Sequence, residues 1–359
     1  MRKSGGRSRM PGRTVTTKKR RARQRGGSSA IGLLAKGDRD VNVFSAVGGA
    51  TQCSPARYDN ALMTGTCLTA PEVLEVAAEL GIATGLASVG AAGKGNSQKS
   101  KGVKGARFDP AALMSRLHER LGTRPGEEDE WIKAPEVARR PKLRERLSAA
   151  FRPEAPEEWE DNPSFWLSNL DIEAVMGQYE DHLGPTQGFR FLGVVPRDFA
   201  SPPKRGPERK CVSDVMCQLS VREELAKGSS QLGTVFNLDK HTGNGSHWTS
   251  AYIGLDPARP HRFGFWYYDS VGRKIPAEMK AFAERLKSEV VQMLGPAAGE
   301  AFVIDHNPVR KQFLYSECGI YAMFFIVACV QTDLPFEQIC SDVMKHDRDM
   351  HKLRSVFFR

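Results

Sequence analysis

The chain of 359 residues lacks any apolar run longer than about 12 residues, whereas a membrane-spanning helix needs about 20. It also lacks a basic stretch followed by an apolar segment and a small-residue cleavage site, the pattern of a secretory signal peptide. We therefore expect no membrane partner. The apolar share of 40% and the charged share of 26% are typical of a soluble protein.

Cysteine is scarce and irregularly spaced. The seven cysteines form an odd set, and no two of them are separated by two residues. These features argue against both a disulfide framework and a zinc ribbon. We therefore expect a reducing, intracellular setting and neither a metal nor another cofactor.

Acidic residues are missing from the first 26 positions, which contain eleven Lys or Arg residues. The formal net charge of the whole chain is +10, so the remainder carries a charge of about −1. Residues 1–52 are too polar to bury a core, and we predict a disordered basic tail. Such a tail can bind nucleic acid non-specifically by neutralising phosphates; a solubilising or nuclear-import tail is the alternative.

Residues 53–150 are predicted to form a helical accessory region. Thr69 and Glu72 have the spacing of a capping box, and Asp109-Pro110 is typical of a second helix start. Between these helices, the Gly-, Ala-, Ser- and Lys-rich segment 81–105 is typical of a flexible linker. The sequence does not indicate a chemistry for this region, so a packing or adaptor role is the default.

Residues 151–359 are predicted to form the catalytic domain. Apolar, β-branched and aromatic segments at 233–238, 248–255, 262–268 and 301–305 are typical of strands. Helical spacing is found over 171–179, from Pro276 onward, over the apolar run 320–330, and around Phe336, Ile339 and Val343. Strands flanked by helices at both ends predict an α+β fold with a central mixed sheet.

Four polar residues within this domain have the order needed for thiol catalysis. Cys318 opens the apolar helix, where the positive end of the helix dipole favours a thiolate. His247 begins one predicted strand and Asp269 ends the next, so the carboxylate can orient the imidazole. Gln312, in the loop before the helix, can donate to an oxyanion together with the Cys318 backbone N–H. Cys329 and Cys340 fit simple buried positions instead.

These residues resemble the ubiquitin-like (SUMO) protease and adenain superfamily of cysteine peptidases. The resemblance lies in His247-Trp248, Tyr268-Asp269-Ser270, Gln312 and Glu317-Cys318-Gly319-Ile320-Tyr321, and it implies a papain-like or adenain-like fold. A closer resemblance is to the polyprotein-processing proteases of large nucleocytoplasmic DNA viruses. It lies in Phe151-Arg-Pro, Trp166-Leu-Ser-Asn-Leu-Asp-Ile-Glu and Phe236-Asn-Leu-Asp-Lys-His.

The resemblance also implies two substrate-binding tryptophans, Trp166 and Trp248, which roof a tunnel that only a Gly-Gly tail can enter. Glycine alone permits such a close approach of backbone. At Ser168-Asn169 the sequence departs from the Trp-Leu-Asn-Asp-type pattern of the SUMO proteases, so a core aromatic is the alternative for Trp166.

The implied function is a cysteine endopeptidase that cleaves after Gly-Gly in viral structural polyproteins during virion maturation. The virion and the host cytoplasm, at the viral factory, are the implied locations, and we expect a monomer. Self-cleavage after Gly27 or Gly49 would release the basic tail. Alternatives are an isopeptidase that removes SUMO- or ubiquitin-like modifiers from host proteins, an acetyltransferase, and a non-enzymatic packaging protein.

Overall fold

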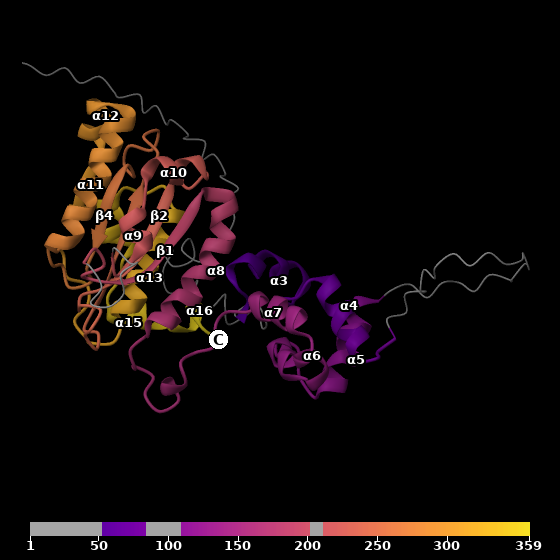
Figure 1. Ribbon diagram of the computed structural model, residues 1–359. Coiled ribbons are helices and arrows are strands. Elements are labelled where there is room, and N and C mark those ends of the chain that lie inside the picture. The colour runs from indigo at the N-terminus through magenta and orange to yellow at the C-terminus, as the bar shows by residue number, and fades with distance from the viewer. Residues whose placement is uncertain (1–51, 84–108, 202–210) are drawn as a thin grey trace, which may run out of the picture.

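The structure, a computed structural model, describes residues 52–83, 109–201 and 211–359. A helical region, formed by residues before Phe151, lies beside a region in which one sheet is covered by helices (Figure 1). The predicted basic tail up to residue 51, the predicted linker from residue 84 onward, and the two predicted self-cleavage sites lie outside the described residues.

One five-stranded mixed sheet forms the centre of the second region, with the strands in sequential order. The outer pairs, β1 with β2 and β4 with β5, are parallel, and the two inner pairs are antiparallel. The strands are β1 (Phe189–Pro196), β2 (Gln231–Asn237), β3 (Trp248–Gly254), β4 (Gly264–Tyr268) and β5 (Val303–His306). The predicted α+β class and mixed sheet are confirmed, and the four predicted strands match β2 to β5.

The edge strand β1 was not predicted from the sequence. Its apolar pattern is interrupted by Arg190 and by Gly193, whose φ is +95°. The pairing with β2 shifts register between Phe191 and Val194, as expected for a β-bulge. A strand that is irregular in this way does not show the strict alternation on which sequence prediction depends.

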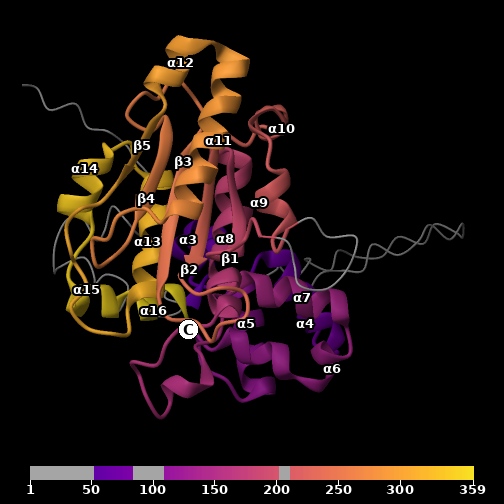
Figure 2. The same cartoon turned by 60° about the vertical axis from the view of Figure 1, so that its left-hand side comes forward.

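Helices cover both faces of the sheet (Figures 1 and 2). Apolar side chains of α8 and α13 form one core, which also contains residues near the C-terminus. A second core contains side chains of α9, α10 and α11. The helices of this region are α8 (Asn169–Gln187), α9 (Asp214–Gln218), α10 (Val221–Ala226), α11 (Ala277–Leu294), α12 (Pro296–Ala301), α13 (Cys318–Gln331), α14 (Phe336–Gln338), a π-helix (Ile339–Val343), α15 (Asp347–Lys352) and α16 (Arg354–Phe357).

Helix α13 packs directly against the sheet. All its residues from Cys318 to Val330 are buried, so it is apolar on every side. The close approach requires a glycine in β2, because a Cβ on Gly233 would lie 2.6 Å from Cγ2 of Ile326. The sheet thereby fixes the position of the helix that begins with Cys318.

The accessory region consists of short helices around its own core, which includes the fully buried Trp131. Its helices are α3 (Tyr58–Thr64), α4 (Ala70–Glu79), α5 (Pro110–Leu121), α6 (Pro135–Ala138) and α7 (Pro141–Ala150). The predicted capping box is present: the Glu72 carboxylate accepts from the Thr69 backbone N–H at 2.7 Å. The predicted Asp109 cap accepts from the backbone of α5 at 3.0 and 3.2 Å.

The accessory region and the catalytic region meet at the C-terminus of the chain (Figure 1). Arg359 forms an ion pair with Asp129 of the accessory region, and Arg152 donates to the carbonyl of Cys53 in that region at 3.2 Å. Residues distant in sequence therefore hold the two regions together.

The sequence argument against a disulfide framework missed two local disulfide bonds. Cys53 is bonded to Cys67, and Cys211 is bonded to Cys217. Both pairs are close in sequence, with separations of 14 and 6 residues, and all four cysteines lie outside the central sheet. An odd total does not exclude such local pairs, because three further cysteines, Cys318, Cys329 and Cys340, are free and buried.

None of the helices within the described ranges has both the length and the apolar character required to cross a membrane.

Candidate active site

His247 and Asp269 meet at one edge of the sheet. His247 directly precedes β3 and Asp269 directly follows β4, and these strands are antiparallel, with Ser250 opposite Tyr268. The start of one strand therefore lies beside the end of the other. The imidazole Nε2 is 2.7 Å from the Asp269 Oδ1 atom, and the carboxylate is completely buried.

A buried asparagine, Asn307, fixes the backbone of Asp269. Its amide nitrogen donates to the Asp269 carbonyl at 2.8 Å, and its amide oxygen accepts from the Asp269 N–H at 2.8 Å. Sequence reasoning missed this residue. The position of Asn307 just after β5, parallel to β4, could have indicated it, because parallel strands end at the same edge.

The electrostatics of His247 favour the imidazolium. Burial lowers the pKa of the imidazole, but the hydrogen bond to Asp269 and the nearby Cys318 thiol outweigh this effect and raise the pKa to about 9. Since Nε2 is bonded to Asp269, the other ring nitrogen is the one available to the thiol. The buried carboxylate thus fixes both the charge and the orientation of the ring.

Cys318 is the first residue of α13 and is buried, with 2% of its surface exposed. The close contacts of the next residue, Gly319, show that neighbouring side chains pack tightly against this end of the helix. A Cβ on Gly319 would lie 3.0 Å from Cδ1 of Leu167 and 3.4 Å from Cδ1 of Trp248. The Cys-Gly sequence therefore allows the thiol-bearing turn to lie directly against these two side chains.

Gln312 is buried beside the Asp269-Ser270 turn. Its amide oxygen accepts from the Ser270 hydroxyl at 2.5 Å, and its amide nitrogen donates to the Leu314 carbonyl at 2.7 Å. The Gln312 backbone N–H also donates to the Ser270 carbonyl at 2.9 Å. These bonds fix the direction of the amide, and its nitrogen carries a second N–H that Leu314 does not use.

A groove of about 540 Å³ is lined by residues that include His247 and Trp248. Trp166 lines it with 42% of its surface exposed, so Trp166 is not a core aromatic. Trp248 is buried and donates through its indole nitrogen to the Leu167 carbonyl at 3.0 Å. The departure at Ser168 has a local cause, since Ser168 and Asp171 form the capping box of α8.

Within the described residues, no group of three or more His, Cys, Asp or Glu side chains is arranged to hold a metal ion.

Comparison with known proteins identifies relatives among viral proteases. No protein-family model matches the chain. It is 26% identical over 216 residues to a protein of Acanthamoeba polyphaga mimivirus that is named as a thiol protease, covering 59% of this chain and 62% of that protein. It is 28% identical over 127 residues to a SUMO-1 cysteine protease of African swine fever virus, covering 35% of this chain and 43% of that protease. The chain thus spans less than two thirds of each relative.

A solved structure shows the same fold. A crystal structure of the African swine fever virus protease superposes with a TM-score of 0.54 at 17% identity, covering 86% of this chain and 96% of that one. The chain is therefore a homologue of viral thiol and SUMO-1 cysteine proteases and has the fold of the African swine fever virus enzyme.

Proposed function

We propose that this protein is a cysteine-type endopeptidase that cleaves after Gly-Gly in viral structural polyproteins. One observation supports the peptidase chemistry above the others: the fully buried Asp269 lies 2.7 Å from His247, and the thiol at the start of α13 is near enough to help raise the pKa of that imidazole. A thiolate, a base and a group that orients the base are the requirements for nucleophilic catalysis by cysteine.

Catalysis would proceed through an acyl-enzyme. The Cys318 thiolate attacks the substrate carbonyl, and the oxyanion accepts hydrogen bonds from the Gln312 amide and the Cys318 backbone N–H. The His247 imidazolium then gives its proton to the leaving amine as the peptide C–N bond breaks. A water molecule, deprotonated by His247, attacks the thioester and releases the carboxylate product and the thiolate.

The groove supports selection of glycine before the cleaved bond. The two large flat side chains of Trp166 and Trp248 line it, together with Leu167. A substrate chain that passes between such walls clashes if it carries side chains. Because the relatives are viral proteases, structural precursors within the virion and the host cytoplasm are the proposed substrates.

A peptide-library assay tests this proposal. We expect cleavage after Gly-Gly by the wild-type protein, strong loss when either glycine is replaced by alanine, and a loss of several orders of magnitude in Cys318→Ser. Cys329→Ser is a matched control, since Cys329 is also a free and buried cysteine of α13. Cleavage that persists in Cys318→Ser would contradict the proposal, and efficient cleavage restricted to a SUMO fusion would favour an isopeptidase.

A further inference from the structure

A buried ion pair lies one residue before the proposed nucleophile. The Glu317 side chain is only 2% exposed, and its Oε2 atom is 3.0 Å from Nε of Arg354, which is 6% exposed. His351 and Ser316 each hydrogen-bond to Glu317 Oε1 at 2.9 Å. Removing one member of such a pair leaves an uncompensated charge in the interior.

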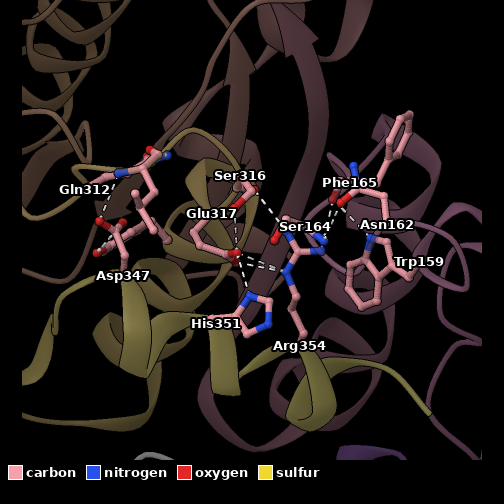
Figure 3. Close-up of polar contacts among 12 residues, drawn as sticks. Trp159, Asn162, Ser164, Phe165, Gln312, Ser316, Glu317, Asp347, His351 and Arg354 are labelled. Carbon is pink, nitrogen blue, oxygen red and sulfur yellow. Dashed lines mark hydrogen bonds and ion pairs between the residues drawn. The ribbon is translucent and has the colours of Figure 1, made fainter.

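The same guanidinium also binds the segment that carries Trp166. The Nη1 atom of Arg354 donates to the Phe165 carbonyl at 3.0 Å, and Nη2 donates to the Ser316 carbonyl at 3.1 Å. The Trp159 indole donates to the same Phe165 carbonyl at 3.0 Å, and its ring lies 4.2 Å below the guanidinium carbon. One arginine thus joins the groove loop to the loop that leads into Cys318 (Figure 3).

A second C-terminal residue, Asp347, holds the other end of the nucleophile loop. Its Oδ2 atom accepts from the backbone N–H groups of Phe313 and Leu314 at 2.7 and 3.0 Å. The carbonyl of Leu314 in turn accepts from the Gln312 amide. Figure 3 shows Asp347 on the Gln312 side of Glu317 and Arg354 on the Phe165 side.

We infer that the segment from Asp347 to Arg354 is a brace for the active site, and that Arg354 is a positioning residue that couples the groove to the nucleophile. The inference rests on the proposed peptidase function. Asp347 fixes the loop that carries the Gln312 amide, whereas Arg354 fixes both Glu317 and the Phe165 carbonyl. Lysine cannot replace Arg354, because one ammonium cannot reproduce three directed bonds from a planar fork.

Two substitutions at Arg354 separate its charge from its geometry. Arg354→Lys keeps the positive charge but loses the planar guanidinium group, and Arg354→Met loses both. We expect kcat/KM on a Gly-Gly peptide to fall about tenfold in the first and about a hundredfold in the second. Arg262→Lys is the matched control, because Arg262 is also a buried arginine and donates to the Thr332 carbonyl. Arg262 lies just before β4, at the end of that strand away from Asp269. This control variant should lower stability without changing kcat/KM of the folded protein.

Two milder variants separate the two sides of the brace. Trp159→Phe keeps a ring below the guanidinium but removes one donor to the Phe165 carbonyl, so we expect KM to rise about threefold to tenfold with little change in kcat. Asp347→Ala releases the loop that carries Gln312, so we expect kcat to fall about tenfold with a smaller change in KM.

The rate at which iodoacetamide alkylates Cys318 reports on the thiol without requiring a peptide to bind in the groove. We expect slower alkylation in Arg354→Met and an unchanged rate in Trp159→Phe. If the folded Arg354 variants match wild type in kcat, KM and alkylation rate, the brace is refuted. If wild type cleaves no peptide, the proposed function fails, whereas the alkylation comparison still tests the brace.

Discussion

Replacing Asp269 with Asn should show how much of the nucleophile's activation comes from one buried carboxylate. The substitution keeps the side-chain size but removes the charge that faces His247 at 2.7 Å. The pKa of His247 is raised from 6.5 to about 9, and Asp269 is the largest of the causes that raise it. A shift of that size corresponds to about 3 kcal/mol in favour of the imidazolium.

Burial lowers the pKa of His247, and without this carboxylate only Cys318 acts to raise it. The pKa of His247 should therefore fall. We expect kcat/KM of Asp269→Asn on a Gly-Gly peptide to fall by about 10² to 10⁴, the size of effect typical of losing the orienting group or the general base. The alkaline limb of the pH profile, near pH 9 in wild type, should move to lower pH.

The assay is the pH dependence of kcat/KM between about pH 5 and 10, with iodoacetamide alkylation measured in parallel. Asp333→Asn is the matched control, because Asp333 forms a similar pair with His261, at 3.0 Å, on the exposed surface. A pH profile of Asp269→Asn that superposes on the wild-type profile would refute the assigned role of Asp269.

Three further predictions follow from the fold and the charge distribution. The pKa of His247 is raised in the folded state. Its contribution to the free energy of unfolding should therefore be complete below about pH 6.5 and lost as the pH rises through about 9. Thermal melts of wild type and Asp269→Asn, compared across this pH window, would detect the loss. Gly233→Ala should destabilise the protein by about 1–3 kcal/mol, because the new Cβ meets Ile326 at 2.6 Å. Gly177→Ala should not, because a Cβ there meets nothing within 4 Å. Equal melting temperatures of these two variants would contradict the packing argument. Deleting residues 1–26, with eleven basic side chains, should leave peptide hydrolysis intact but weaken retention on DNA, and unchanged retention at low salt would discard a nucleic-acid role.

Local sequence patterns determined the elements that surround the site. The capping box of α4, the strands β2 to β5 and the start of α13 follow from short-range rules, since caps, apolar alternation and helix propensity are properties of neighbouring residues. The order of His247, Asp269, Gln312 and Cys318 indicated thiol chemistry before any coordinates, because chain order at strand and helix ends constrains which groups can meet.

Only the tertiary structure decided how these groups are held. Arg354 binds the carbonyl of Phe165, 189 residues away, and Asn307, just after the neighbouring strand β5, hydrogen-bonds to the backbone of Asp269. The irregular strand β1, the exposure of Trp166 and the two local disulfides were likewise not determined by pattern. Contacts between distant segments depend on how the chain packs as a whole, and no periodicity or spacing in the sequence records them.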